Sequence, residues 1–326
     1  MIRYTVIMPA YNVEQYIERA IESVLNQTLT DWELIIVNDG SIDKSGDIAD
    51  KYSKKDSRIR VIHQKNKGSG YARQAGVDAS KGEYICFVDP DDFLDSKALY
   101  QNWIYIKTFK PQVIVNGFKL MLDQQRITKI TPNLLGYFEK QEFLDNFQKF
   151  SNQVNKVVWN KIYKKNFLIN NQIKFTNLPV GQDWRFNIDV YDNIETIYIS
   201  EDLFYNYDST IEQSSVKRYR SNRLEIELKI INRNEEFLQK WGIRNSKEIM
   251  TKDYYNAMLV EFNNIKNSSN IKGNLSKAQI FKKNLVQYNL EKIPKQLKIT
   301  DFNSINEKII FLFLRQEMYR ILFCIL

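Results

Sequence analysis

The chain has 326 residues, of which 43% are hydrophobic and 26% are charged, and its formal net charge at pH 7 is +8. This length and composition exclude a disordered or fibrous protein and predict a full hydrophobic core. One histidine and two cysteines exclude a histidine-rich zinc site and a disulfide framework, and they leave acid and base chemistry mainly to carboxylates. We expect His63, at the end of a predicted strand, to be a packed or hydrogen-bonded residue rather than a catalyst.

The first residues run straight into a predicted strand, without the long apolar core of a secretory signal. Two cysteines without a pairing or metal-binding spacing suit a reducing compartment. We therefore expect a cytoplasmic protein.

The first 90 residues alternate between the two regular structures. Strands are predicted at 3–8, 33–37, 59–63 and 83–88, and helices at 13–26, 44–55 (capped by Asp43) and 71–80. This β-α-β-α-β-α-β order predicts a mostly parallel sheet flanked by helices, with right-handed crossovers.

The fourth of these strands is followed by three carboxylates, Asp89, Asp91 and Asp92. Ligands of open α/β sheets bind outside the carboxyl ends of the strands, and an Asp-x-Asp pair offers only hard oxygen ligands, which suit a bound cation. The other interpretation is a solvated acidic turn that leads into a helix capped by Asp95 or Ser96.

Polar groups collect at two further strand ends, at Pro9-Ala10-Tyr11 and at Asn38-Asp39. In a parallel sheet these ends lie along one edge, which favours a binding site. No G-x-G-x-x-G pattern follows the first strand, which argues against a nicotinamide-dinucleotide fold. A nucleotide site at this edge would need carboxylate-bound metal and a cation such as Arg73 to neutralise phosphate.

Five segments together resemble a family 2 glycosyltransferase of the GT-A (Rossmann-like) fold. They are Val-Ile-Met-Pro-Ala-Tyr-Asn (6–12), Ser-Val-Leu-Asn-Gln-Thr (23–28), Val-Asn-Asp-Gly-Ser-Ile-Asp (37–43), Gly-Tyr-Ala-Arg-Gln-Ala-Gly (70–76) and Phe-Val-Asp-Pro-Asp-Asp (87–92). The resemblance covers about residues 3–215, with Asn38 in place of a more usual Asp and Gln74 in place of Asn. It implies an inverting enzyme that uses a nucleotide-activated sugar, usually a UDP-sugar, and Mn²⁺ or Mg²⁺.

The resemblance also implies roles for individual residues. Asp91, with Asp89 nearby, would hold the metal, and Asp39 would accept a hydrogen bond from the uracil imide. Pro9 and Tyr11 would border the nucleotide, and Arg73 would contact the nucleotide or its phosphates.

Past residue 95 we expect a helix at 97–109, a strand at 113–116 and a hairpin within 118–131. Trp159-Asn160-Lys161-Ile162-Tyr163 followed by Gly181-Gln182-Asp183 resembles the family segment that ends in a Glu-Asp pair, and the first acid is here Gln182. Asp183 then matches the family's catalytic base. The alternative role is an N-cap for a helix at 184–191, and one residue can fill both roles.

The C-terminal third differs in charge and in pattern. Residues 1–215 hold 26 Lys and Arg against 28 Asp and Glu, a net charge of −2, whereas residues 216–326 hold 21 against 11, a net charge of +10. Residues 209–215 resemble a loop that closes over the diphosphate, and a serine-rich linker explains them equally well. From Arg218 onward helical periodicity predominates within 224–241, 247–265 and 275–290. We predict a catalytic domain at 1–215 and a basic helical region at 216–326.

The last eighteen residues of the segment 302–326, from Ile309 onward, are strongly apolar but carry Arg315, Glu317 and Arg320, too many charges for a membrane-spanning helix. We expect an amphipathic helix here. It either lies in the interface on the inner face of the plasma membrane or packs into an oligomer or the domain itself.

The sequence thus predicts transfer of a hexosyl or N-acetylhexosaminyl group from a UDP-sugar to a hydroxyl acceptor, with inversion, during surface polysaccharide, capsule or teichoic acid assembly. The acceptor would be a saccharide, a lipid-linked saccharide or a cell-wall polymer. Two alternatives are a nucleotidyltransferase that makes a sugar nucleotide and a nucleic-acid-binding module in the basic tail. The first lacks a glycine-rich phosphate loop, and the second lacks any nucleic-acid motif, so we expect no nucleic-acid partner.

Overall fold

Strand β1 (Tyr4–Ala10) is buried along its whole length and pairs in parallel with β2 (Trp32–Asn38) on one side and with β4 (Tyr84–Phe87) on the other. The structure, a computed structural model, describes residues 2–123, 126–150, 153–211, 219–302 and 304–325. Both faces of a central parallel strand are covered, which explains why β1 and β2 are apolar at nearly every position.

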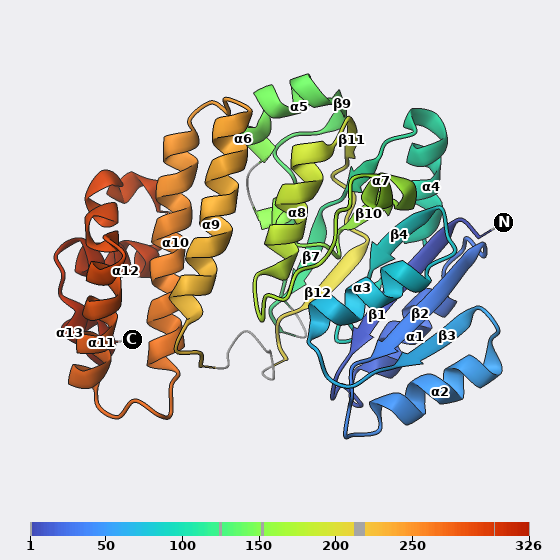
Figure 1. The fold of residues 1–326 in the computed structure, drawn as a ribbon, viewed down its shortest axis with the longest axis horizontal. Helices are drawn as coiled ribbons and strands as arrows, with labels where there is room; N and C mark the ends of the chain where they lie inside the picture. The colour runs from blue at the N-terminus through green and yellow to red at the C-terminus, as the bar shows by residue number, and fades with distance from the viewer. Residues whose placement is uncertain (1, 124–125, 151–152, 212–218, 303, 326) are drawn as a thin grey trace. The chain divides into compact units, whose positions relative to one another are not determined.

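The main sheet has eight strands in the order β3-β2-β1-β4-β10-β6-β11-β9 (Figure 1). Its remaining strands are β3 (Ile59–His63), β6 (Val113–Val115), β9 (Gly136–Glu139), β10 (Lys161–Lys164) and β11 (Thr196–Ile199). Strand β10 runs antiparallel to both β4 and β6, and β9 runs antiparallel to β11. The predicted, mostly parallel α/β sheet is confirmed, and the antiparallel insertion of β10 is an addition that the sequence did not indicate.

A second sheet of four strands has the order β5-β12-β7-β8. Its members are β5 (Phe93–Leu94), β7 (Phe118–Met121), β8 (Ile127–Ile130) and β12 (Tyr205–Asp208). The pairing of β7 with β8 is the hairpin expected within residues 118–131. Because β5 follows the acidic turn directly, this small sheet joins that turn to Asp208 at the end of β12.

Helices connect the strands of the first unit. They are α1 (Ile17–Leu25), α2 (Ser45–Lys55), α3 (Ser69–Ala79), α4 (Ala98–Phe109), α5 (Lys140–Asp145), α6 (Phe147–Phe150), α7 (Lys165–Asn170) and α8 (Gln182–Asn193), with a 3₁₀ turn at Gln153–Asn155. Helix α3 packs on β1 and β2, where Gly76 allows close approach because a Cβ there would lie 2.4 Å from Ile7. Asp43 accepts from the N–H of Ser45 at the start of α2, but the N-cap of that helix is Lys44 and not Asp43 as predicted.

The chain divides into two compact units, residues 1–212 and 213–326. The domain boundary expected between residues 215 and 216 lies outside the described residues. The second unit contains α9 (Arg223–Lys240), α10 (Ser246–Lys266), α11 (Asn274–Gln287), α12 (Ile305–Arg315) and α13 (Tyr319–Ile325), with 3₁₀ segments at Leu290–Gln296 and Ile299–Asp301. In the described part of the chain no helix is long and apolar enough to cross a membrane.

The prediction of a single helix over 302–326 is wrong. Helix α12 ends at Arg315, Glu317 has a φ of +56°, and α13 begins at Tyr319. The break lets apolar side chains of both helices enter the core of the second unit, among them Phe311 and Leu322. Tyr319, the first residue of α13, is 4% exposed.

Candidate active site

The carboxyl ends of β1, β2 and β4 lie together, as their parallel pairing requires. Ala10 of β1 pairs with Asn38 of β2, and the N–H of Asp39 donates to the carbonyl of Ala10 at 2.9 Å. On the other side of β1, the N–H of Val88 donates to the carbonyl of Ile7 at 3.0 Å, just before Asp89. The predicted edge, with its three sets of polar residues, is therefore assembled as expected.

Asp39 is 3% exposed, and its carboxylate holds the loop that leads into α3. Oδ1 accepts from the side-chain amide of Gln64 at 2.7 Å and from the N–H of Lys67 at 2.9 Å, and Oδ2 accepts from the N–H of Gly68 at 2.7 Å. A carboxylate has about four acceptor positions, so one remains for a ligand. Beside it Pro9 is buried in β1, and Tyr11 is 48% exposed.

Arg73 on α3 is 6% exposed and lies between two carboxylates. Nη2 lies 2.7 Å from Oδ1 of Asp89, and Nη1 lies 2.9 Å from Oδ1 of Asp183. Burial alone would lower the pKa of Arg73, but Asp183 and Asp89 together raise it. The cation predicted to contact the nucleotide is thus engaged by two acidic residues from distant parts of the chain.

Asp183 is the second residue of α8, and the N-cap of that helix is Gly181, with a φ of +71°. The alternative role for Asp183 as the N-cap is therefore wrong. Burial raises the pKa of Asp183 above its ordinary value, against the opposing effect of Arg73. A carboxylate with a raised pKa, held in one orientation, has the properties of a general base.

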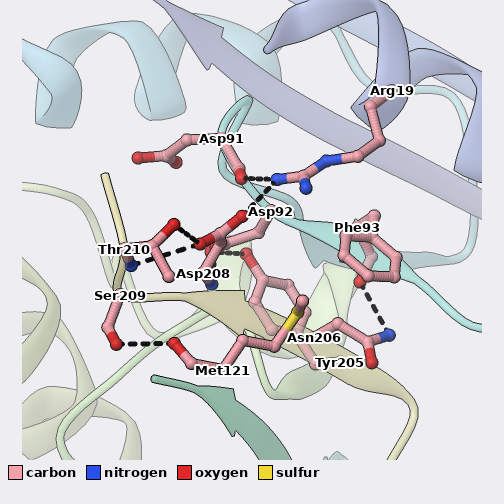
Figure 2. A network of polar contacts seen from close by, with 10 residues as sticks. All are labelled: Arg19, Asp91, Asp92, Phe93, Met121, Tyr205, Asn206, Asp208, Ser209 and Thr210. Atoms are coloured by element: carbon pink, nitrogen blue, oxygen red, sulfur yellow. Dashed lines mark hydrogen bonds and ion pairs between the residues drawn. The ribbon is translucent and has the colours of Figure 1, made fainter. Parts of the chain in front are cut away.

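Asp91 presents its carboxylate differently from Asp89. In Figure 2 its backbone oxygen accepts from Arg19, and its carboxylate points away from that arginine. Burial, then the negative charge of Asp89, and also that of Asp208, raise the pKa of Asp91 to about 6. Such crowding of negative charge favours a bound cation.

Tyr205 and Asp208, to which the sequence analysis gave no role, organise this cluster together with Asp92 (Figure 2). Asp92 is 0% exposed, and its carboxylate accepts from the Tyr205 hydroxyl at 2.6 Å and from the N–H of Asp208 at 2.9 Å. The Tyr205 hydroxyl also accepts from the N–H of Asp89 at 3.1 Å. One signal could have identified Asp208: it ends a short strand, 205–208, in which aromatic and polar residues alternate.

Asp208 connects three segments of the first unit. Its Oδ2 accepts from Nη2 of Arg19 at 3.0 Å, and its Oδ1 accepts from the Thr210 hydroxyl at 2.6 Å. Ser209, next in the chain, donates through its hydroxyl to the carbonyl of Met121 at 2.6 Å. This is the start of the loop expected at 209–215, and residues 212–215 lie outside the described part.

The available oxygen ligands fit a divalent cation whose coordination is completed by oxygens of the substrate. Among the described residues, no three acidic, histidine or cysteine side chains are arranged to hold a metal by themselves. Asp89 already binds Arg73, and Asp92 accepts from Tyr205 and Asp208, whereas the carboxylate of Asp91 points away from Arg19. Mg²⁺ and similar ions are commonly held by one or two carboxylates together with phosphate oxygens, which matches this arrangement.

Comparison with known proteins gives relatives for the sequence and for the fold. EpsJ of Bacillus subtilis, described as an uncharacterized glycosyltransferase, is 34% identical over 213 residues, which are 62% of this chain and 60% of that protein. The poly(ribitol-phosphate) beta-glucosyltransferase of Bacillus spizizenii is 29% identical over 218 residues, 63% of this chain and 32% of that protein. The match therefore spans less than two thirds of either relative.

The crystal structure of residues 1–349 of Staphylococcus aureus TarS in complex with UDP-GlcNAc is similar in fold. The TM-score is 0.62 at 18% identity, and the alignment covers 98% of this chain and 89% of that one. Residues 5–180 match the family described as "Glycosyl transferase family 2". This match covers more than half of the chain and includes the strand ends that form the site up to Asp91, so the chain belongs to glycosyl transferase family 2.

Proposed function

We propose that the protein transfers a sugar from a UDP-sugar to a hydroxyl acceptor, with inversion at the anomeric carbon. One observation carries the proposal: a single buried guanidinium, that of Arg73, holds the candidate base Asp183 beside the acidic turn that contains Asp91. Asp183 and Asp91 differ in their surroundings, as acid–base and metal-binding groups of one site should.

In this account Asp183 removes the proton from the acceptor hydroxyl as that oxygen attacks the anomeric carbon. Arg73 fixes the Asp183 carboxylate at 2.9 Å, so the base loses little freedom when the acceptor arrives. A divalent cation bound to Asp91, with Asp89 nearby, would neutralise the charge that develops on the leaving diphosphate. Inversion requires the base and the leaving group to lie on opposite faces of the sugar.

Asp39 supports uracil as the base of the donor. Its remaining acceptor position can receive the imide N–H of uracil, while its other bonds hold the loop before α3. The complex of TarS with UDP-GlcNAc supports a uridine nucleotide for a protein of similar fold. Competition among nucleoside diphosphates tests this point, and stronger binding of GDP or dTDP than of UDP would contradict it.

We further propose that the acceptor is a saccharide or polymer of the bacterial surface, and that the enzyme meets it on the inner face of the plasma membrane. The glucosyltransferase that acts on poly(ribitol phosphate) supports a polymer acceptor. The second unit carries the net charge of +10 and exposes apolar residues of α12 and α13. These features suit reversible contact with anionic lipid.

The whole function is tested by incubating the protein with a panel of nucleotide sugars and Mn²⁺, and by measuring release of the nucleoside diphosphate. Metal-dependent release of UDP, followed by NMR assignment of the new glycosidic bond, would establish donor and stereochemistry. Formation of a sugar nucleotide from a nucleoside triphosphate, with no transfer, would instead favour the nucleotidyltransferase.

A further inference from the structure

Lys161, on β10, lies in the interior of the first unit, where burial lowers its pKa and its hydrogen-bond acceptors favour the charged form. Its side chain is 1% exposed, and Nζ donates to the carbonyl of Val154 at 2.7 Å, to the side-chain oxygen of Asn160 at 2.8 Å and to the carbonyl of Val157. Three acceptors match the three hydrogens of an ammonium group. Burial of a charge is unfavourable unless the charge has a specific set of partners, so this arrangement calls for an explanation.

The peptide group between Val157 and Val158 connects Lys161 to the candidate base. Its carbonyl oxygen accepts from Lys161, and its N–H, which belongs to Val158, faces the carboxylate of Asp183 and stabilises the charged form of that carboxylate. A peptide group is planar, so a donor that fixes the carbonyl also fixes the direction of the N–H. Polarisation of the carbonyl by an ammonium strengthens the N–H as a donor, because successive hydrogen bonds reinforce one another.

A second donor holds the same carbonyl from the side of α8. The side-chain amide of Asn187 donates to Val157 O at 3.0 Å, and the hydroxyl of Tyr163 donates to the Asn187 side-chain oxygen at 2.8 Å. Asn187 lies four residues after Asp183, on the same face of the helix. The Val157–Val158 peptide is thus fixed between β10 and the helix that carries the candidate base.

We propose that Lys161 is a positioning residue for Asp183 and that it acts through the Val157–Val158 peptide. The proposal rests on the proposed function for the role of Asp183 as the base, and it adds a residue that does not touch the reacting atoms. The charged groups that face Asp183 are Arg73 from α3, Asp89 from the acidic turn and Lys161 from β10. Of these groups, Arg73 contacts the Asp183 carboxylate directly, and Lys161 acts on it through the Val157–Val158 peptide.

The link can be observed without any enzymatic assay. The sequence contains one Val-Val pair, residues 157 and 158, so protein labelled with ¹³C-carbonyl and ¹⁵N in valine alone gives a single peak in an HNCO spectrum. In Lys161→Met the Val157 carbonyl carbon and the Val158 amide proton should both move upfield, because each hydrogen bond weakens. The control is Lys164→Met, the same change on the same strand, which should leave the peak in place. An unmoved amide proton in Lys161→Met would overturn the proposal.

A second variant keeps the link testable if Lys161→Met fails to fold. Asp183→Ala removes the acceptor and leaves Lys161 intact, so the Val158 amide proton should again move upfield. If that proton does not respond to Asp183→Ala, the Val158 N–H does not hold the base and the proposal is wrong.

Activity then separates positioning from a general structural role. Lys161→Met should lower kcat on the order of 10- to 100-fold, with UDP affinity changed less than about 3-fold. The acid limb of the pH profile should move to higher pH, because Asp183 loses stabilisation of its charged form. In a protein that already carries Asp183→Asn, adding Lys161→Met should lower kcat by less than about a further 2-fold. Losses that multiply in the double variant, or a parallel loss of UDP binding, would mean a structural role only.

The two proposals fail in different ways. If the unmodified protein transfers no sugar, the proposed function is wrong, whereas the HNCO result for the link between Lys161 and Asp183 still holds. If the wild type transfers sugar but the HNCO peak does not move in Lys161→Met, only the proposal for Lys161 is wrong.

Discussion

Nη1 of Arg73 lies 2.9 Å from Oδ1 of Asp183, although the two residues are 110 positions apart in the chain. The same guanidinium reaches Asp89 at 2.7 Å. Arg73 is therefore a structural centre of the site, where it balances two carboxylates that would otherwise repel one another.

Loss of Arg73 should destabilise the first unit strongly. Arg73→Met leaves Asp89 and Asp183 without their shared cation, and we expect the free energy of unfolding to fall by about 3–5 kcal/mol. Chemical denaturation measures this. Arg126→Met is the control, because the Arg126 side chain is 74% exposed in its pair with Asp123, and it should cost less than about 1 kcal/mol. Similar losses in the two variants would show that the buried pairs matter little.

Tyr205 should support donor binding through the acidic turn. Tyr205→Phe removes the hydroxyl that bridges the Asp92 carboxylate and the N–H of Asp89, so we expect a loss of about 1–3 kcal/mol in unfolding free energy and weaker binding of UDP with Mn²⁺. Tyr207→Phe, two residues along β12, is the matched control, because phenylalanine keeps the ring stacking on Trp159 at 5.5 Å. If both variants bind UDP as the wild type does, the bridge is unimportant for the site.

The residues at the sheet edge could be predicted because their positions follow from local sequence. Ala10 ends a short apolar strand, Asp39 and Asp89 come after two others, and parallel pairing brings such strand ends together without any long-range information. The family resemblance added Asp183, whose role stays a prediction.

Other features depend on contacts that no local pattern encodes. Strand β10 inserts antiparallel beside β4, and the bonds of Lys161 to residues 154 and 157 follow from that insertion. The break between α12 and α13 occurs at Glu317 in a left-handed conformation, which sequence signals associate with Gly or Asn instead. The packing of Phe311 and Tyr319 in the core determines where the C-terminal helix breaks, and the amphipathic pattern alone could not predict that break.

The stability of the second unit should depend on pH through Glu261. Burial raises the pKa of Glu261 above its ordinary value of 4.5, even though the side-chain amides of Asn264 and Asn284 donate to its carboxylate. With the folded pKa above the unfolded one, stability is fully present below about pH 4.5 and is lost as the pH rises through the folded pKa. Glu261→Gln should remove this loss, so the variant should match or exceed the wild type at pH 8.

Thermal unfolding between pH 4 and 8 measures the effect of Glu261. Glu248→Gln on the same helix is the control, because Glu248 is exposed in its pair with Lys252, and the wild-type pH dependence should persist in it. A pH dependence unchanged by Glu261→Gln would refute the assignment.

The membrane prediction needs a test that leaves the core intact. A chain cut near Thr300 would lose Phe311 and Leu314 from the interior of the second unit, so truncation would unfold it. The outward face of α12 carries Ile305, Ile309 and Leu312, which are 76%, 36% and 41% exposed. Replacing these three with Ser should abolish pelleting with anionic liposomes, while the wild type should pellet and should be released as salt rises.

The matched control for the membrane test replaces three exposed apolar residues of the first unit, Ile42, Leu122 and Ile127, with Ser. That variant should pellet as the wild type does. Failure of the wild type to pellet with any liposome would favour a protein partner for α12.

The central claim is that Asp91 serves the donor and Asp183 serves the acceptor. Asp91→Ala and Asp183→Asn should each lower turnover by on the order of 100-fold or more. Calorimetry with UDP and Mn²⁺ separates them directly. The account predicts that Asp91→Ala weakens metal-dependent UDP binding at least about 10-fold, whereas Asp183→Asn, which keeps an acceptor for Arg73, binds UDP within about 3-fold of the wild type. Loss of UDP binding in Asp183→Asn as severe as in Asp91→Ala would contradict it.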